Sequence, residues 1–580
     1  MTLVMVSTIG VCRGQQGLEA ARPHVAAAID GWVDDFANRR LGVRGLLRRE
    51  VRLQPRYAKH VHRATRALPA AARAMGPLLR KEDYERLTHL DVLQKLLFFA
   101  ESNPSPAIGD ALLRVASVGI AGSFLDRTAF EVRELGHWTL ARMKDQGTWF
   151  LVLRAAAGER LPVLTELRAQ RGADEAVSEG PGRRVAALRL LGQRGLPVFR
   201  STMEAALVDP DPRVRLAAAE SMRGPWKAAT IEKVGQVLAR ERHPVVSQAL
   251  VRLLFKMLKR APETMTPGAR HAVARGAIAQ LGKSGWRTDM DLLDLVEAYP
   301  HKSVIPFLIE ALDLSVKSPD ALVSAINKQA SPLLRERAGL LLRAITGALV
   351  PIDDVQAWRE FWQAEQDNIE VPLRLSKPRP GMTRTKFYGV PITGTSIAFL
   401  IDTSGSMDDP PASKGPVTGL RRVRAARTRL EAAKQQMLLA AQVMAPGSQY
   451  FLLSFADEAR AWTRKPIKPD QRSTRSLTGL LSRLNARGGT NLYAGLIAAL
   501  EIEGRSYGDA ALPKIDELFL LSDGDPTTGD VRDADLICEM VQQANKYAKV
   551  RINAVFTGTG DGAALLRRLA EENDGVFVQR

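Results

Sequence analysis

Short apolar runs alternate with segments of helical spacing over the last third of the chain. Consecutive apolar residues indicate buried strands, and apolar residues three or four apart indicate helices that bury one face. The alternation predicts strands at 397–401, 450–455, 518–521, 550–556 and 576–579, and helices at 423–444, 473–484, 493–500, 534–547 and 563–572. Strands that alternate with helices form mostly parallel sheets covered on both faces. We therefore expect an α/β, Rossmann-like domain at residues 393–580.

The preceding part of the chain shows helical spacing and weak repetition instead. Residues 23–160 are rich in Ala, Leu and Arg at helical intervals, which predicts a helical region. Within 161–365, similar segments that begin with Pro or a charge and continue with small residues lie at 184–188, 211–219, 243–250 and 331–338. Small residues on one face let a neighbouring helix approach closely, so stacked helix pairs explain the pattern. We expect a multidomain protein with an all-α solenoid before the α/β domain.

Two segments punctuate this organisation. Trp358, Phe361 and Trp362 share one helical face, which predicts core packing in the last helix of the solenoid. Pro, Lys and Arg without periodicity then predict a linker at 366–392.

Composition supports several domains and adds a strong positive charge. The chain has 580 residues, more than one hydrophobic core usually supports, and its 45% hydrophobic and 25% charged content is globular. The formal net charge is +19, of which about +4 belongs to residues 381–580 and +15 to residues 1–380. A basic surface attracts nucleic acid, anionic lipid or acidic proteins, but charge spread over helices is more often simply solvated. We favour the solvated interpretation.

The cysteines and the N-terminus bear on the compartment. Cys12 and Cys538 are the only cysteines, so neither a disulfide framework nor a structural zinc cluster is expected. Residues 1–22 are interpreted as a leader or a disordered N-terminus, because residues 1–11 are mostly apolar but lack a basic start. A clipped signal would place the protein in the cell envelope, the periplasm or outside the cell, and otherwise it would be cytoplasmic. No apolar run reaches the length of a membrane span.

Oxygen-bearing side chains follow the predicted strands of the C-terminal domain. Asp402, Ser404 and Ser406 come directly after the strand at 397–401, and Asp523 follows the strand at 518–521. Thr490 lies in a loop before a predicted helix. Ligands bind at the carboxyl edge of such sheets, and carboxylate and hydroxyl oxygens suit a hard divalent cation. The pattern predicts a metal site formed by three loops.

This set of residues resembles the metal-ion-dependent adhesion site of the von Willebrand factor type A (vWA) family, which combines DxSxS, a Thr and an Asp. All five positions match, and the resemblance covers about the last third of the chain. It implies that Ser404, Ser406 and Thr490 hold Mg²⁺, Mn²⁺ or Ca²⁺ directly or through water, while Asp402 and Asp523 mainly supply charge. In the family, an Asp or Glu of a protein partner completes the coordination.

The helical part carries a second resemblance. Residues 209–222 are similar to the second helix of a HEAT repeat, although the other copies are degenerate. The whole arrangement resembles bacterial proteins, common in planctomycetes, that join HEAT-like helices to a C-terminal vWA domain. We therefore expect a non-enzymatic adhesion or scaffold protein, with the solenoid as a second interaction surface.

No catalytic pattern competes with this expectation. The eight His residues are scattered, and no Ser/His/Asp or Cys/His set is recognisable. The segment 282–284 lacks the Gly that opens a phosphate-binding loop, and 558–562 lacks G-x-G-x-x-G spacing, so a turn beside the metal edge explains it better.

Two other functions remain open. The Ro family of RNA-binding proteins also joins HEAT-like helices to a vWA domain, and the basic helical part fits such a use, although aromatic residues do not obviously interleave with the basic ones. A vWA adaptor subunit of an ATPase complex is the other alternative.

A basic run follows the first loop of the predicted metal site and consists of Arg421, Arg422, Arg424, Arg427 and Arg429. It is either a solvated surface or a flank of the metal site that selects an acidic partner.

Overall fold

The computed structural model describes most of the chain from residue 106 onward. The described ranges are 106–159, 181–260, 266–312, 334–371, 386–411 and 426–580, apart from gaps at 123, 282, 284–285, 299, 336, 353, 393, 445–447, 464, 503–504, 510–512 and 561. The predicted leader, most of the predicted linker and three arginines of the basic run (Arg421, Arg422 and Arg424) lie outside the described residues. The domain boundaries predicted from the sequence therefore stay predictions.

The described residues fall into two compact units. The first extends to Val237 and includes Lys256–Ala269 and Ser506–Gly508; the second comprises Leu238–Phe255, Arg270–Arg505 and Asp509–Arg580.

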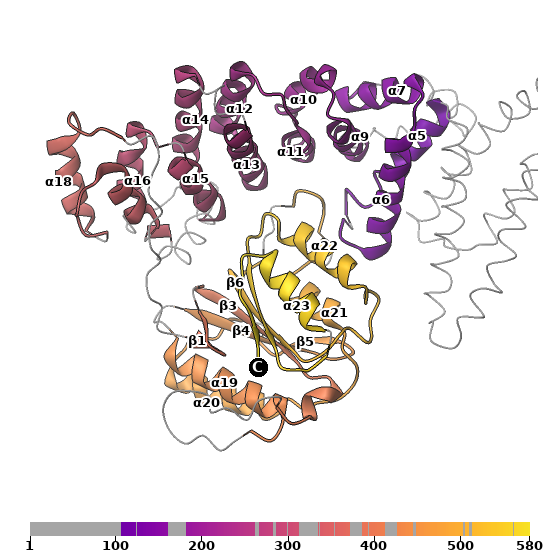
Figure 1. Cartoon of the computed structure of the whole chain (residues 1–580), viewed down its shortest axis with the longest axis vertical. Coiled ribbons are helices and arrows are strands. Elements are labelled where there is room, and N and C mark those ends of the chain that lie inside the picture. The colour runs from indigo at the N-terminus through magenta and orange to yellow at the C-terminus, as the bar shows by residue number, and fades with distance from the viewer. Residues whose placement is uncertain are drawn as a thin grey trace, which may run out of the picture. The chain divides into compact units, whose positions relative to one another are not determined.

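The first unit is helical (Figure 1). Its elements are α5 (Pro106–Val115), α6 (Arg127–Arg142), α7 (Gln146–Ala157), α9 (Pro181–Arg194), η1 (Pro197–Phe199), α10 (Arg200–Ala206), α11 (Pro212–Ser221) and most of α12 (Ala228–Arg240). Carboxylates start three of these helices, because the side chains of Asp126, Asp145 and Asp211 each accept a hydrogen bond from a backbone N–H of the first turn. The helical character expected for this part of the chain is confirmed.

Small residues allow α9 and α11 to pack closely. An added Cβ on Gly192 of α9 would lie 2.4 Å from the backbone oxygen of Ser221, so only glycine fits there. The alanines of both helices, such as Ala187 and Ala218, are fully buried. This is the close approach that the small residues predicted. The assignment to HEAT repeats stays a prediction.

Helices continue into the second unit. They are α13 (Pro244–Arg260), α14 (Pro267–Gln280), α15 (Trp286–Ala298), η3 (Lys302–Val304), α16 (Ile305–Leu312) and α18 (Val355–Glu365). In α18, Trp358 is fully buried and its indole N–H donates to the Pro351 carbonyl at 3.0 Å, whereas Phe361 and Trp362 are only half-buried. The predicted core role therefore holds for one of the three aromatics.

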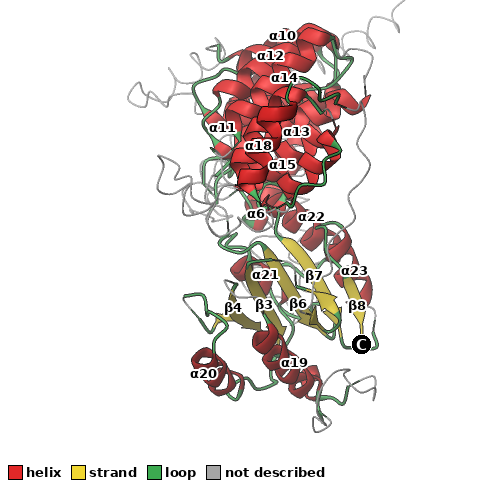
Figure 2. Cartoon of the chain, turned by 90° about the vertical axis from the view of Figure 1, so that its left-hand side faces the viewer, coloured by secondary structure: helices red, strands yellow, loops and turns green. Residues whose placement is uncertain are grey.

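A mostly parallel sheet forms the rest of the second unit (Figure 2). Its strands are β3 (Ser396–Asp402), β4 (Gln449–Phe455), β5 (Ala459–Ala461), β6 (Glu517–Ser522), β7 (Arg551–Phe556) and β8 (Phe577–Gln579), in the order β5-β4-β3-β6-β7-β8. All neighbours pair in parallel except β4 and β5. The expected α/β architecture is confirmed.

Helices cover both faces of this sheet. Helices α19 (Arg429–Val443) and α20 (Gln471–Leu481) lie on one face, while α21 (Leu492–Ala499), α22 (Ala534–Asn545) and α23 (Gly562–Glu571) lie on the other (Figure 1). The sequence did not predict β5 or the hairpin of β1 (Lys386–Phe387) and β2 (Val390–Pro391), because two or three residues are too few to show a period.

Aromatic packing fixes β3 against its neighbours. The Phe399 and Phe519 rings stack at 5.5 Å between centroids, and the Phe387 ring meets them edge-on at 5.1 and 5.4 Å. All three side chains are fully buried. Burial of one such side chain stabilises a fold by about 1.5–3 kcal/mol. The three rings therefore fix β3 against β6 and against the β1–β2 hairpin.

Candidate metal centre

The direction of the chain reverses between β3 and β6. From β3 the chain crosses to β4 on one side, and from β6 it crosses to β7 on the other side. The loops that follow β3 and β6 therefore diverge and leave a crevice at the carboxyl edge of the sheet. Because Ile401 pairs with Leu521, Asp402 and Ser522 come next to each other at this edge.

Asp402 is the most deeply buried residue of the site. One carboxylate oxygen accepts the backbone N–H of Ser404 at 2.8 Å, and the other accepts the hydroxyl of Ser522. Burial raises the pKa of Asp402 to about 6, while the hydrogen bonds from Ser522 and Ser404 act in the opposite direction. The side chain is thus oriented by its neighbours, and it carries a charge that burial disfavours.

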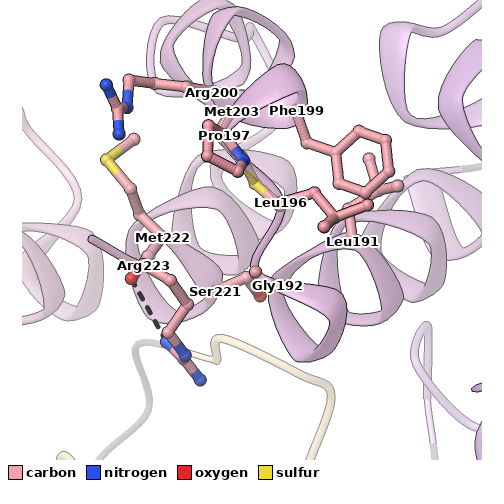
Figure 3. A pocket seen from close by; sticks show the side chains of 11 residues that line it. Leu191, Gly192, Leu196, Pro197, Phe199, Arg200, Met203, Ser221, Met222 and Arg223 are labelled. Atoms are coloured by element: carbon pink, nitrogen blue, oxygen red, sulfur yellow. Dashed lines mark hydrogen bonds between the residues drawn. The ribbon is translucent and has the colours of Figure 1, made fainter. Parts of the chain in front are cut away.

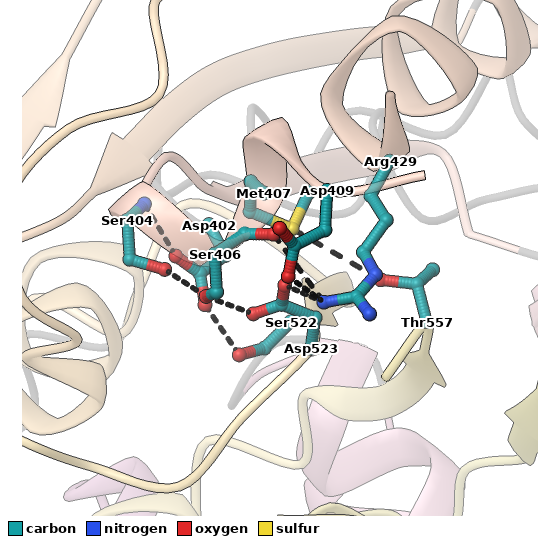
Figure 4. A network of polar contacts seen from close by, with 9 residues as sticks. All are labelled: Asp402, Ser404, Ser406, Met407, Asp409, Arg429, Ser522, Asp523 and Thr557. Atoms are coloured by element: carbon teal, nitrogen blue, oxygen red, sulfur yellow. Dashed lines mark hydrogen bonds and ion pairs between the residues drawn. The ribbon is translucent and has the colours of Figure 1, made fainter. Parts of the chain in front are cut away.

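A chain of hydroxyls connects the first loop to the second (Figure 4). The Ser404 and Ser406 hydroxyl oxygens are 3.2 Å apart, and the Ser406 hydroxyl donates to Oδ1 of Asp523 at 2.8 Å. Asp523 is buried, as is Ser404. Four of the five residues predicted for the site therefore lie in one cluster of oxygen atoms, built from the loops after β3 and β6.

The fifth residue, Thr490, lies in a loop held against the first one. Backbone hydrogen bonds run from Gly405 N–H to the Gly488 carbonyl at 3.0 Å and from Arg487 N–H to the Thr403 carbonyl at 2.8 Å. Thr490 itself is buried, and its backbone N–H donates to the Thr527 hydroxyl at 2.8 Å. The structure thus places the third predicted loop beside the first.

Arg429 is a part of the site that the sequence indicated only as one member of a basic run. Its Nη1 donates to Oδ2 of Asp523 at 2.6 Å, to the Ser406 carbonyl at 3.3 Å, and lies 3.5 Å from Oδ2 of Asp409. Its side chain is 12% exposed. No spacing rule could have singled it out, because it is one of five arginines within 421–429 and nothing in their spacing separates it from the others. The helix predicted at 423–444 begins only at Arg429 among the described residues.

The donor set fits a hard divalent cation. Two hydroxyls and two carboxylates meet at the carboxyl edge of the sheet, the loop that carries Thr490 lies beside them, and oxygen donors with few charges are what Mg²⁺ and related ions accept. Among the described residues, no group of three or more His, Cys, Asp or Glu side chains could hold a metal. A softer ion that needs thiolate or imidazole ligands therefore finds no comparable set in this part of the chain.

A small pocket in the first unit is chemically different (Figure 3). Its lining is mostly apolar and comes from α9, η1, α10 and the end of α11, with Leu191, Pro197, Phe199 and Met203 among the contributors. Its charged residues, Arg200 and Arg223, are both basic, and Arg223 is occupied by the carbonyls of Glu220 and Met222. Its lining contains no carboxylate, so it is no candidate for a cation.

Helix lengths also bear on membrane association. Within the ranges that the structure describes, no helix is both long and apolar enough to cross a bilayer.

The comparisons with known proteins each cover about a third of this chain or less. The chain is 25% identical over 200 residues to inter alpha-trypsin inhibitor, heavy chain 4, of Mus musculus, covering 32% of this chain and 19% of that protein. It is 24% identical over 153 residues to inter-alpha-trypsin inhibitor heavy chain H1 of Mesocricetus auratus, covering 26% and 14%. The matched region thus spans about a fifth or less of these curated relatives.

Solved structures match over a similar share. A von Willebrand factor type A protein from Catenulispora acidiphila is 22% identical, with a TM-score of 0.24, covering 32% of this chain and 38% of that one. Proximal thread matrix protein 1 from the mussel byssus, with a zinc-occupied MIDAS motif, is 19% identical, with a TM-score of 0.21, covering 32% and 41%.

Residues 397–524 match the profile of the von Willebrand factor type A domain family. This range begins in β3, ends just after β6, and contains all five residues of the candidate site. The chain therefore contains a vWA domain preceded by a helical region.

Proposed function

We propose that this chain is a non-enzymatic adhesion or scaffold protein whose vWA domain binds a divalent cation and, through it, an acidic side chain of a protein partner. Ser404, Ser406 and Thr490 would hold the ion, and Asp402 and Asp523 would supply the negative charge. When bound, the cation would offer positive charge and exchangeable positions to a carboxylate.

The observation that carries this proposal is the convergence of Asp402, Ser404, Ser406 and Asp523 at the carboxyl edge of the sheet. Their loops start from adjacent strands, so the rigid β3–β6 pair sets their spacing. The Ser522 hydroxyl and the Ser404 N–H hold Asp402 in one orientation, which is the preorganisation that a binding site requires.

The composition of the loops favours binding over catalysis. Residues 402–409, 487–491 and 522–525 contain neither His nor Glu, and the two buried aspartates of the site, Asp402 and Asp523, are engaged with hydroxyls, a backbone N–H group or Arg429. A general base would need a free carboxylate or imidazole within reach of a substrate.

The test combines metal binding with partner capture on the full-length chain. Calorimetric titration with Mn²⁺ should show binding to the wild type, and Thr490→Val, which removes one hydroxyl at nearly constant volume, should weaken it. Ser482→Ala, at the exposed end of α20, is the matched control and should behave as the wild type. Wild type that takes up no Mn²⁺ would overturn the proposal.

Partner capture then tests the second half of the proposal. Proteins retained by the wild type in Mg²⁺ should be released by EDTA and should not bind Thr490→Val. Retention that persists in EDTA would place the interaction elsewhere on the chain and contradict a metal-bridged contact.

RNA binding is a second candidate, supported by one observation in the helical part. The guanidinium of Arg142 lies 4.2 Å from the ring centre of Trp138, and that of Arg154 lies 5.9 Å from the ring centre of Phe150. Both aromatic rings are more than half exposed. Exposed rings paired with arginines suit stacking of unpaired bases. This arrangement is the interleaving that the sequence pattern alone did not reveal.

A further inference from the structure

Arg429 places a permanent positive charge inside the candidate metal centre. Its side chain is 12% exposed, and the Asp523 carboxylate that it contacts is fully buried. Oδ1 of Asp523 accepts the Ser406 hydroxyl and Oδ2 accepts Arg429, so both oxygens of this carboxylate are engaged. A divalent cation that draws on the charge of Asp523 must share it with the guanidinium.

The guanidinium is held in this position by the start of α19. The backbone N–H of Arg429 donates to the Asp409 carbonyl at 2.9 Å, and Thr428 caps the helix by accepting the backbone N–H of Glu431. The same arginine also contacts the Ser406 carbonyl. Arg429 is thus fixed to both loops of the site, unlike a surface arginine that can swing away into solvent.

The charges of the site can be compared with and without this residue. The two buried carboxylates, Asp402 and Asp523, together contribute two negative charges, and a guanidinium is always charged in proteins. Asp409 also lies 3.5 Å from Arg429, but its side chain is 61% exposed, so water screens its charge and it is left out of the balance. With Arg429, a site loaded with a divalent cation has one excess positive charge, which a partner carboxylate neutralises. Without Arg429, the loaded site would be neutral, and the same carboxylate would add an excess negative charge.

We propose that Arg429 couples the two binding events: it weakens binding of the metal alone and makes metal and partner carboxylate bind more tightly together than separately. This inference rests on the proposed function and names its regulation. Coupling of this kind is reciprocal, since whatever the carboxylate does to metal affinity the metal does to carboxylate affinity. The vWA domain would then hold its cation firmly only while an acidic partner is engaged.

The test measures Mn²⁺ affinity of the full-length chain by calorimetry, in chloride buffer and in acetate buffer of equal ionic strength. Acetate is the carboxylate probe. For the wild type, we expect weak binding in chloride and tighter binding in acetate. Arg429→Gln should bind Mn²⁺ about tenfold more tightly in chloride, because removal of a neighbouring like charge is worth roughly that factor. The enhancement by acetate should shrink.

Two further variants separate charge from structure. Arg429→Lys keeps the charge and should retain the behaviour of the wild type. Arg427→Gln removes an exposed positive charge two residues earlier and should also change nothing, since no contact of its side chain with the site is observed among the described residues. Weaker Mn²⁺ binding in both Arg429→Gln and Arg429→Lys would show that the arginine only anchors the loops, and would overturn the inference.

The remaining outcomes are also decisive. Equal Mn²⁺ affinity of Arg429→Gln and the wild type, with equal acetate effects, would overturn the coupling while leaving metal binding intact. Absence of Mn²⁺ binding from the wild type and from every variant would instead refute the proposed function. The two failures are therefore distinguishable in one series of titrations.

Discussion

At the scale of single residues, Asp402 is held in a state that burial disfavours. Its folded-state pKa of about 6 lies above the ordinary value of 3.8, because desolvation outweighs the hydrogen bonds from Ser522 and Ser404. The folded chain therefore binds this proton more tightly than the unfolded chain does. When a chelator keeps the protein free of metal, the contribution of Asp402 to the free energy of unfolding should rise as the pH falls from about 6 toward 4. Above about pH 6 the ionised carboxylate should lower the free energy of unfolding.

This argument predicts that Asp402→Asn is more stable than the wild type in EDTA at pH 7.5, by up to roughly 3 kcal/mol. The amide is neutral, and it can still accept from Ser404 and pair with Ser522. The gain should shrink at pH 4.5, where the wild-type carboxyl is protonated as well. Urea unfolding at both pH values measures it, with Asp408→Asn, at an exposed carboxylate, as control. A variant that is no more stable at pH 7.5 would show that Asp402 bears no cost of burial.

At the scale of elements, the turn between β7 and α23 packs against the backbone of Asp523. An added Cβ on Gly558 would lie 1.9 Å from the backbone oxygen of Asp523, and neither backbone can give way easily. The same turn places the Thr557 hydroxyl 4.0 Å from the Met407 sulfur. The glycine-rich segment that the sequence suggested as a turn beside the metal edge therefore touches the backbone of a predicted site residue.

Gly558→Ala should lower the free energy of unfolding by about 1–3 kcal/mol and weaken Mn²⁺ binding, because the new methyl group pushes Asp523 out of position. Gly560→Ala lies in the same turn, with no atom within 4 Å of its added Cβ, and should alter neither property. Thermal unfolding and Mn²⁺ titration of both variants provide the measurement. Equal effects of the two substitutions would mean that the turn matters only through backbone entropy.

Some elements and site residues could be predicted from the sequence, and others could not. Long periodic segments such as β3 and α22 were predictable, since burial on one or both faces dictates their apolar pattern. The order of the loops gave the site residues, because parallel strands bring their carboxyl ends to one edge. In the sequence, Arg429 is one of five arginines within 421–429, and nothing in that pattern distinguishes it. Its contact with Asp523 is a long-range contact, which a local pattern does not predict. Short β5 depends on pairing with β4, which local propensity does not encode.

At the scale of the whole molecule, one buried cation joins segments far apart in the sequence. Arg287 of α15 donates to the backbone carbonyls of Pro513 and Ile515, at 2.9 and 2.8 Å, and to that of Ala548. These carbonyls precede β6 and β7, at the edge of the sheet opposite the candidate site. Burial lowers the pKa of Arg287 to about 10, so the charge persists at neutral pH.

Arg287→Met should therefore destabilise the second unit by about 3–5 kcal/mol, because it leaves buried carbonyls without donors while preserving much of the packing. The exposed Arg275 of α14 offers a matched control, and Arg275→Met should unfold as the wild type does. Urea unfolding followed by tryptophan fluorescence distinguishes the two. A shift of the midpoint in neither variant would mean that the helix is held by apolar contacts alone.

The net charge of +19 makes its own prediction for the intact protein. Binding to a polyanion by charge alone releases counterions, so it should be measurable at low ionic strength and fall steeply by about 0.2 M salt. We expect retention of the full-length chain on poly(U) to follow this course, with no effect of EDTA or of Asp402→Asn, because most of the positive charge lies outside the vWA domain.

Trp138→Ala distinguishes a specific RNA-binding site from binding by charge alone. Stacking of one base is worth about 1–3 kcal/mol, so a specific RNA site would lose roughly tenfold in affinity with this variant and would keep part of its binding at high salt. An unchanged salt curve for Trp138→Ala would assign the positive charge to solvation and long-range attraction, and would leave the metal centre as the specific binding site.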